Sequence, residues 1–358
     1  MKKSIQKGYL LLFIVFICLP GISYSLLKPF IKSENTENRK LSERPSFENT
    51  IYTKFASEYE KYYEDHLPYR NQLITINSAI SYFLFKESIN SSVIIGKDGW
   101  LFLNGDNVIE NYKRELVYSE ETIEEIKKKY QDISMHYEQE GIRVVFMIIP
   151  NKEEIYGDDY LPDDINAQKN NQENRTDTLV SYLREEAGLE VIYPKEEFLK
   201  YKDDFQLYFK ADTHWNLLGA YIAEQQLLEL IYGQRSYLED ENIHKGELTY
   251  RISANLDLAN MISLRKFLLD DYDYYIEEYP WTDNFESISG INGYSDKVLF
   301  IGDSFYASMQ PYLYRDFKDC KALVRGYYES SIVEEYEPDV VVIEVVERYA
   351  EQLKDFNP

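Results

Sequence analysis

The sequence predicts an α/β fold in which a mostly parallel sheet is covered by helices on both faces. From about residue 90 onward, continuous runs of β-branched and apolar residues alternate with segments of helical spacing. Strands without a polar face are typical of parallel sheets that are buried on both sides. The sequence also predicts a membrane helix in front of this α/β domain, because an apolar run extends from Tyr9 to Leu27.

Residues 1–27 are predicted to form a single transmembrane helix that serves as a signal anchor. Lysines precede the apolar run, which places the N-terminus in the cytoplasm and the rest of the chain outside. Pro20 and Gly21 interrupt the run, and residues 23–25 (Ser-Tyr-Ser) resemble a small-residue cleavage site. A cleaved signal peptide, and hence a secreted protein, is therefore the alternative to a single-pass membrane protein with an extracytoplasmic C-terminal domain.

Residues 28–90 are predicted to be a juxtamembrane segment. Its first part, to about residue 50, is polar and reads as an extended linker. Helical spacing of apolar residues begins at Phe55 and continues through Tyr62, and a second amphipathic run covers Leu73 to Phe85. The two runs predict a helical juxtamembrane segment between the anchor and the main domain.

Residues 91–358 are predicted to form the catalytic domain. It opens with a hairpin from Val93 to Leu103 around a Lys-Asp-Gly turn. Residues 232–296 show no clear period and are interpreted as an insertion near the active-site face. Strands are expected at 143–149, 189–193, 297–301, 321–325 and 339–345, and helices at 120–140, 174–187, 217–231 and from about 347.

Composition excludes some partners. The net charge of the 358-residue chain is −24, which argues against nucleic acid, since binding phosphates needs clustered lysine and arginine. Cys18 lies in the apolar run, which leaves Cys320 alone in the exported part and no disulfide framework. Tyrosine is abundant, at 34 residues. A+T-rich codon usage explains this excess, and aromatic platforms for sugar rings are the alternative.

A candidate nucleophile follows one of the predicted strands. Residues 298–301 read as a buried strand, and Gly302, Asp303 and Ser304 come directly after it. The carboxyl ends of strands form the functional edge of an open α/β sheet, and Gly302 permits a sharp turn there. By itself the tripeptide favours a simple helix cap at Asp303 or Ser304, but its position at a strand end, together with an Asp-x-His pair elsewhere, favours a nucleophile.

A candidate base lies in the segment before the helix at 217–231. Asp212 and His214 are two residues apart there, so that the carboxylate can orient the imidazole for proton transfer with Ser304. Asp212 can also cap the following helix, and Trp215 can either wall the site or pack beneath it. The other histidines, His66, His136 and His244, show no metal-ligand spacing, so no metal site and no cofactor are predicted.

These two segments resemble a known family. The Gly302–Phe305 run is similar to the nucleophile block of SGNH hydrolases, and Asp212-Thr213-His214-Trp215 resembles the signature of DHHW proteins and of the alginate-type polysaccharide O-acetylation proteins. Thr213 stands where DHHW proteins repeat the histidine. Further similarities extend over about residues 40–350, at Asp65–Arg70, Gly96–Phe102, Ile149–Lys152, Pro338–Glu344 and Glu347-Arg348.

The resemblance implies a three-layer α/β/α sandwich of the SGNH type that is circularly permuted, since the order along the chain is Asp, His, Ser. It implies an acyl-enzyme on Ser304, with His214 as base and Asp212 as its orienting acid. The SGNH glycine and asparagine blocks are not recognisable, so Asn151, at the end of another predicted strand, is the candidate second oxyanion donor. The candidate residues for contact with the oxyanion or the substrate also include Gly302 and Trp215.

Three functions are compatible with this site. The first is an extracytoplasmic O-acetyltransferase that acts on a cell-surface or exported polysaccharide. For this function, the resemblance implies a membrane-bound O-acyltransferase as the supplier of acetyl groups, because acetyl-CoA is cytoplasmic. The second is a carbohydrate acetyl-esterase with the same triad, in which water takes the acetyl group. The third is a non-catalytic glycan-binding partner in a polysaccharide synthesis complex.

Overall fold

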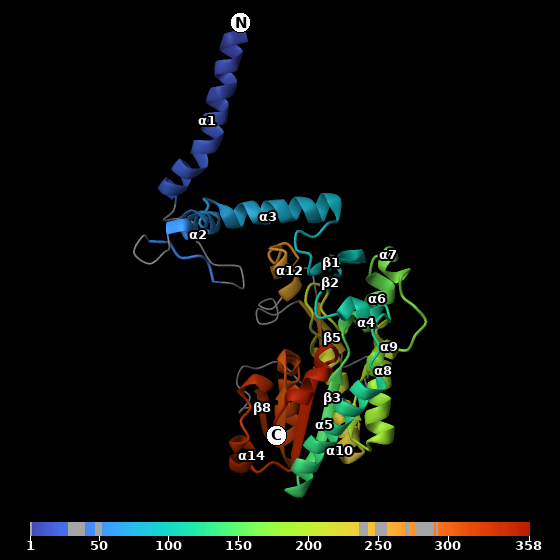
Figure 1. The fold of residues 1–358 in the computed structure, drawn as a ribbon. Helices are drawn as coiled ribbons and strands as arrows, with labels where there is room; N and C mark the ends of the chain where they lie inside the picture. The colour runs from blue at the N-terminus through green and yellow to red at the C-terminus, as the bar shows by residue number, and fades with distance from the viewer. Residues whose placement is uncertain are drawn as a thin grey trace. The chain divides into compact units, whose positions relative to one another are not determined.

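The chain divides into two compact units. A computed structural model describes residues 2–27, 40–46, 52–235, 243–247, 256–268, 272–276, 290 and 293–358. One unit comprises Met1–Asn90 with Asn260–Arg265, and the other comprises Ser91–Ala259 with Lys266–Pro358 (Figure 1). The linker expected at residues 28–50 lies outside the described residues, apart from 40–46.

The first unit is helical. Its elements are α1 (Lys2–Leu27), α2 (Tyr52–Asp65), α3 (Arg70–Ile80) and the π-helical η2 (Ser81–Phe85). The window Gln6–Tyr24 in α1 has a mean hydropathy of 1.7 and none of it is buried, so α1 is long and apolar enough to cross a membrane. The helix continues through Pro20, where the sequence suggested an interruption.

The second unit is built on a five-stranded sheet in the order β4-β3-β9-β7-β8. All of its paired neighbours run parallel, which confirms the expected sheet. The outer strand β8 is longer than the weak apolar run at 321–325 indicated. The strands are β3 (Arg143–Ile149), β4 (Val191–Ile192), β7 (Tyr294–Gly302), β8 (Phe317–Val324) and β9 (Val340–Val346).

Helices cover both faces of this sheet, as Figure 1 shows. Because successive residues of a strand point to opposite faces, Val145 and Phe146 of β3 belong to different core clusters. One face packs against α6 (Lys152–Tyr160), α9 (Lys195–Tyr201), α10 (Leu217–Tyr232) and α13 (Gln310–Asp316). The other packs against α5 (Glu120–Gln139), α8 (Arg175–Ser181), η4 (Tyr182–Glu186), α14 (Ser331–Tyr336) and η9 (Glu347–Asp355).

Shorter elements complete the unit. The predicted hairpin is present as β1 (Val93–Ile95) and β2 (Leu101–Leu103), joined by the 3-10 turn η3 (Lys97–Gly99). Three elements that periodicity did not predict lie among the described residues of 232–296: the antiparallel strands β5 (Ile243–Glu247) and β6 (Tyr272–Ile276), and the helix α12 (Asp257–Met261). The remaining elements are α4 (Val108–Tyr112), α7 (Asp163–Asn166), η7 (Ser304–Ser308) and η8 (Arg325–Tyr327). The final helix, expected from about residue 347, begins at Glu347 and is the 3-10 helix η9.

Candidate active site

Ser304 lies at the carboxyl edge of the sheet, where the sequence placed it. It is the first residue of the 3-10 helix η7, directly after β7. Asp303 caps this helix, since one carboxylate oxygen accepts from the Phe305 N–H at 2.9 Å and the other accepts from the Val346 N–H at 2.8 Å. One side chain therefore fixes the nucleophile turn to the end of β9.

A buried acid packs under the same turn. Glu344 in β9 accepts from the Asp303 N–H at 2.8 Å and is fully buried. Burial, followed by repulsion from Asp303, raises the pKa of the Glu344 carboxyl well above its usual range. A Cβ atom at Gly302 would collide with Glu344 Oε2. The glycine therefore makes room for this carboxyl group, in addition to ending the strand.

His214 faces Ser304 across the edge. Its Nε2 lies 2.7 Å from Ser304 Oγ, and its Nδ1 lies 2.6 Å from Asp212 Oδ1. The second bond assigns the Nδ1–H tautomer, so that Nε2 can accept the serine proton. The structure thus brings together the three side chains that the sequence singled out. Residues 208–215 form a tight loop closed by the Phe209 N–H, which donates to His214 O at 3.1 Å.

Electrostatics favour a basic imidazole. Burial acts to lower the pKa of His214, but the charge and hydrogen bond of Asp212 outweigh it, and the pKa lies above its ordinary value. The pKa of Asp212 is lowered: burial opposes this change, and the imidazole and two backbone N–H groups produce it. The Asp212 carboxylate is therefore held in its ionised form and favours the imidazolium form of His214.

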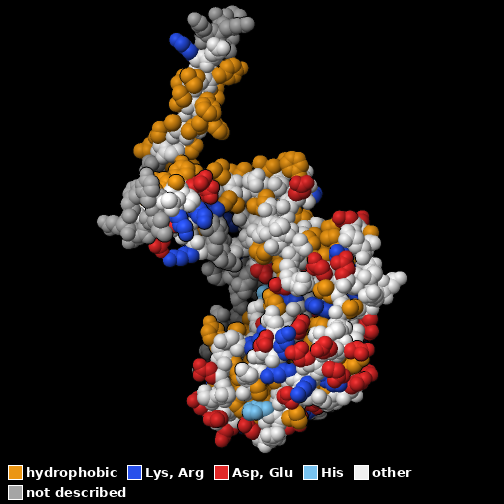
Figure 2. Space-filling model, viewed as in Figure 1, with side chains coloured by type: hydrophobic (Ala, Val, Ile, Leu, Met, Phe, Trp, Pro, Cys, Tyr) orange, Lys and Arg blue, Asp and Glu red, His pale blue; other side chains and the backbone are white. Residues whose placement is uncertain are grey.

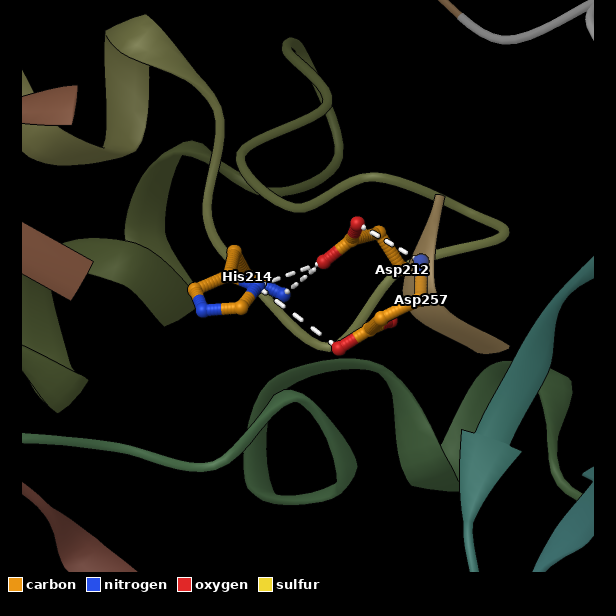
Figure 3. Close-up of side chains that lie close together, drawn as sticks. All are labelled: Asp212, His214 and Asp257. Atoms are coloured by element: carbon orange, nitrogen blue, oxygen red, sulfur yellow. Dashed lines mark hydrogen bonds and ion pairs between the residues drawn. The ribbon is translucent and has the colours of Figure 1, made fainter. Parts of the chain in front are cut away.

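A second carboxylate, which the sequence analysis did not assign to the site, lies beside this pair (Figure 3). The Asp257 N–H donates to Asp212 Oδ2 at 3.0 Å, and Asp257 Oδ2 lies 3.7 Å from His214 Nδ1. Asp257 also accepts from the Thr213 N–H at 2.8 Å and from the Thr213 hydroxyl. Thr213, which stands at the first histidine position of the DHHW signature, is thus bound to this acid.

Asp257 could not be found by spacing, because it lies 45 residues beyond Asp212 and comes from the weakly patterned segment 232–296. Burial, followed by repulsion from Asp212, raises the pKa of Asp257 to about 6. A shared cation would need closely spaced ligand atoms. The ligand atoms that Asp212, His214 and Asp257 offer lie within 4.8 Å of one another. Hydrogen bonds already engage both oxygens of Asp212 and both oxygens of Asp257.

A buried lysine supports the loop that carries Asp212 and His214. Lys152 is 1 % exposed. Its Nζ donates to the carbonyl oxygens of Phe209, Lys210 and Asp212 at 3.2, 3.1 and 2.6 Å. Three backbone acceptors satisfy a buried ammonium group and hold the loop against α6, which begins at the end of β3.

Trp215 packs beneath the site and does not wall it. Its side chain is fully buried, and its indole N–H donates to Phe305 O at 2.9 Å. The Phe305 ring in turn contacts the His214 ring, with 4.6 Å between centroids. This bond joins the nucleophile turn to the base loop from below, so that both halves of the site share one support.

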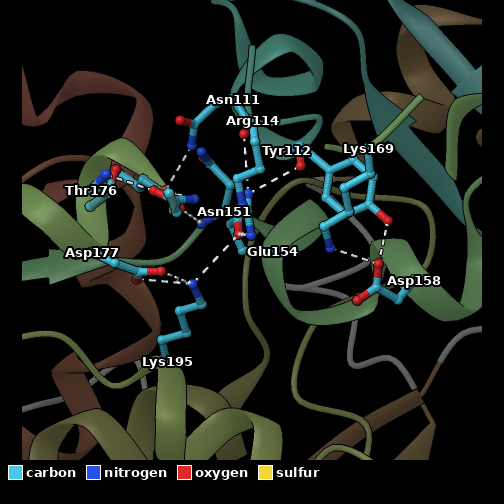
Figure 4. A network of polar contacts seen from close by, with 12 residues as sticks. Asn111, Tyr112, Arg114, Asn151, Glu154, Asp158, Lys169, Thr176, Asp177 and Lys195 are labelled. Carbon is cyan, nitrogen blue, oxygen red and sulfur yellow. Dashed lines mark hydrogen bonds and ion pairs between the residues drawn. The ribbon is translucent and has the colours of Figure 1, made fainter. Parts of the chain in front are cut away.

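Asn151 lies at the end of β3 and is 2 % exposed (Figure 4). Its N–H donates to Glu347 Oε2 at 2.8 Å, and its Oδ1 accepts from Arg348 Nη1 at 3.2 Å. Its Nδ2 has no hydrogen-bond partner within the described residues. Arg348 connects Asn151 with the nucleophile turn, since its guanidinium carbon lies 5.7 Å from the centre of the Phe305 ring. The Asn151 amide is therefore held in place, and its buried Nδ2 binds nothing among the described residues.

A buried polar network surrounds Asn151 at this edge (Figure 4). Arg114 forms a bidentate pair with Glu154 at 2.8 and 2.9 Å, and Lys195 binds Asp177 at 2.6 Å. Burial and repulsion from Glu154 raise the pKa of Glu347 to about 7. The network holds the ends of β3 and β9 together, because Glu347 directly follows β9 and accepts from Asn151.

Comparisons with known proteins identify the family to which the chain belongs. Residues 93–315 match the family model described as the SGNH hydrolase-like domain of the acetyltransferase AlgX. The probable alginate O-acetylase AlgJ of Pseudomonas putida is 24 % identical over 332 residues, which is 85 % of this chain and 82 % of that protein. AlgJ of Pseudomonas aeruginosa is 25 % identical over 209 residues, and this match spans 49 % of its length.

Two solved structures align with the chain at lower sequence identity. The O-acetyltransferase domain of Pseudomonas putida AlgJ aligns with a TM-score of 0.49 at 19 % identity, over 75 % of this chain and 96 % of that one. A DHHW family protein from Eubacterium siraeum aligns with a TM-score of 0.47 at 13 % identity, over 74 % and 98 %. The match to the family model covers well over half of the chain and includes Asp212, His214 and Ser304. The chain therefore belongs to the family of SGNH hydrolase-like acetyltransferase domains typified by AlgX.

Proposed function

We propose that this protein is an extracytoplasmic serine-dependent O-acetyltransferase that moves an acetyl group through Ser304 onto a polysaccharide hydroxyl. The observation that carries the proposal is the unbroken chain of short contacts from Ser304 Oγ through the imidazole to Asp212 Oδ1, at 2.7 and 2.6 Å. The AlgJ proteins described as probable alginate O-acetylases support polysaccharide as the acceptor class.

In the first half-reaction, His214 Nε2 takes the hydroxyl proton and Ser304 Oγ attacks the acetyl carbonyl. The tetrahedral oxyanion accepts hydrogen bonds from the Ser304 N–H and from Asn151 Nδ2. A donor of this kind contributes about 10²–10³ in rate. His214 then returns the proton to the leaving group, and the acetyl ester remains on Ser304.

In the second half-reaction, a sugar hydroxyl replaces the leaving group. His214 takes its proton, the hydroxyl oxygen attacks the acetyl-serine carbonyl, and collapse of the intermediate releases Ser304 with its proton restored. If water enters in place of the sugar, the outcome is hydrolysis. The triad serves both reactions, so an acetyl-esterase is the alternative, and acceptor binding decides between them.

Location and partners belong to the same proposal. The apolar helix α1 supports an N-terminal anchor, and the lysines before it favour an outward-facing catalytic unit. The alternative is secretion after cleavage of the signal. Acetyl-CoA is cytoplasmic, so a membrane-bound O-acyltransferase is proposed as the supplier of acetyl groups. Tethering the domain to the membrane would keep Ser304 within reach of that supplier.

Replacing the nucleophile tests the proposal. We expect Ser304→Ala to lower both release of p-nitrophenol from its acetate and acetyl transfer to an oligosaccharide by about 10³-fold or more. Ser308→Ala changes a serine in the same 3-10 helix and is the matched control, which should keep activity. Transfer that exceeds hydrolysis would select the transferase over the esterase.

Full activity in Ser304→Ala would disprove the acyl-serine mechanism. If the wild-type protein and Ser308→Ala are also inactive while retaining binding to oligosaccharide, the non-catalytic glycan-binding function would be the correct one. Mass spectrometry of the wild-type protein after a brief exposure to the ester should find an acetyl group on Ser304, which is the intermediate that both enzymatic functions require.

A further inference from the structure

The juxtamembrane helices α3 and η2 carry a row of exposed apolar side chains that their own fold does not use. These side chains are 45–72 % exposed and recur at helical spacing. Figure 2 shows hydrophobic side chains gathered along α3. We call this set the apolar stripe, and it consists of Leu73, Ile76, Ile80, Phe83 and Leu84.

A different face of α3 and η2 packs against the rest of the helical unit. Ser78 and Tyr82 are buried, and the Ser78 hydroxyl donates to Ile262 O. Helical geometry places residues 78 and 82 one turn apart and on the side opposite the centre of the stripe. Since the packed face is elsewhere, the stripe is not part of the core. A contiguous exposed apolar row of this size indicates a binding surface.

The charge pattern of this segment differs from that of the whole protein. The chain has a net charge of −24, yet no Asp or Glu occurs between Arg70 and Lys86. The two cations mark the ends of the segment that carries the stripe. Apolar residues on one side, basic residues at the ends and no acidic groups are typical of helices that lie in a bilayer interface.

The start of α3 contacts the end of the apolar helix α1. Tyr69, the residue before α3, donates its hydroxyl proton to Ser23 Oγ at 3.0 Å. Its ring meets the Tyr24 ring edge-on, with 5.4 Å between centroids. Tyr24 ends the apolar window of α1, so α3 begins beside the end of that window. Tyrosines are enriched at membrane–water interfaces.

We propose that the apolar stripe binds the bilayer surface, with α3 and η2 lying in the headgroup region of the membrane that α1 crosses. The proposal rests on the membrane anchor proposed above. Lipid is the occupant that these observations favour, because the helix that carries the stripe begins at a contact with the end of α1 and, like α1, has no acidic residue. Binding there would hold the helical unit that contains α3 and η2 against the membrane surface.

The test uses the full chain in liposomes of phosphatidylcholine and phosphatidylglycerol. In a background with Cys18→Ala and Cys320→Ala, single variants Ile76→Cys and Leu84→Cys carry an environment-sensitive NBD probe. Lys128→Cys, an exposed position on the polar helix α5, is the control. We expect blue-shifted emission at 76 and 84, and quenching by lipids with a doxyl group near the headgroup end of the acyl chain, with neither effect at 128.

Carbonate extraction of the same liposomes separates the two proposals. If α1 stays membrane-integrated and the probes at 76 and 84 behave like the probe at 128, lipid binding by the stripe is overturned and the anchor stands. If the chain is extracted, the anchor fails and lipid binding fails with it. A blue shift without doxyl quenching would indicate a protein in place of lipid, such as a second copy or a membrane-protein partner, and would also overturn the proposal.

Discussion

His214 lies between two carboxylates that differ in exposure. The side chain of Asp212 is 2 % exposed and that of Asp257 is 36 % exposed. Asp212 forms the short bond with the imidazole, whereas Asp257 binds the intervening Thr213. Arg348 opposes both acids by lowering the pKa of His214. We therefore propose that Asp212 orients the imidazole of His214. Asp257 supports the loop that carries His214 and raises the pKa of the imidazole.

Removing the charge of Asp257 should shift the pH profile. Above its pKa of about 6, Asp257 is ionised and favours the imidazolium form of His214. Asp257→Asn should therefore lower the pKa of His214. Because the proposed mechanism uses the neutral imidazole of His214 as the base, the acidic limb of kcat/KM for p-nitrophenyl acetate should move to lower pH by about one unit. Asp132→Asn, an exposed acid on α5, should leave the limb in place. An identical limb in both variants would refute this role.

Gly302 has a packing requirement that can be measured. An added methyl group at this position would meet Glu344, Tyr306 and Phe300, whereas Gly326 has no atom within 4 Å of an added Cβ. We expect Gly302→Ala to cost about 1–3 kcal/mol in the free energy of unfolding and to lower kcat, because the Ser304 turn moves. Gly326→Ala should do neither. Equal stabilities in urea unfolding would contradict this account.

At the scale of elements, the nucleophile turn depends on its cap. Asp303 caps η7 and also binds the end of β9, whereas Ser119 caps α5, far along the chain from the triad. Both Asp303→Ala and Ser119→Ala should lower stability by about 1 kcal/mol. Only Asp303→Ala should also lower kcat, since it releases the Ser304 turn. Thermal melts and kinetics of the two variants make the comparison, and unchanged kcat in Asp303→Ala would refute it.

Elements with a strong apolar pattern were predictable. Residues 143–149 and 339–345 are continuous apolar runs, and both form central strands. The helix α6 was missed because its sequence begins Lys152-Glu153-Glu154 and has no apolar stripe. Tertiary contacts bury these charges: Lys152 binds backbone carbonyls, Glu153 accepts from the Leu103 N–H at 2.9 Å, and Glu154 pairs with Arg114. Long-range partners of this kind leave no local pattern.

At the scale of the whole molecule, buried acids give stability a dependence on pH. The pKa of Glu347 is raised from 4.5 in the free residue to about 7 in the folded chain, first by burial and then by Glu154. The folded state thus binds this proton more tightly than the unfolded state. Its contribution is complete below about pH 4.5 and is lost as pH rises through about 7.

Glu347→Gln should reduce this dependence. Glutamine cannot titrate, so the fall in melting temperature between pH 5 and pH 8 should become shallower. The variant should also be less stable overall, by about 1–3 kcal/mol, because its amide cannot accept from all of Asn111, Asn151 and Asn174. Glu121→Gln, on the surface of α5, is the control and should keep the wild-type slope. Parallel slopes in the two variants would contradict the prediction.

The sequence by itself determined the strands that form the sheet centre, the serine at the end of one of them, and the Asp-x-His pair. These features are encoded over short distances along the chain, by apolar period and by the chemistry of neighbouring side chains. Only the tertiary structure decided that Asp257 joins this pair, that Arg348 and Glu347 hold Asn151, and that Trp215 lies beneath the site. Those contacts join residues that are far apart in sequence, and they form only when the folded sheet brings the ends of its strands to one edge.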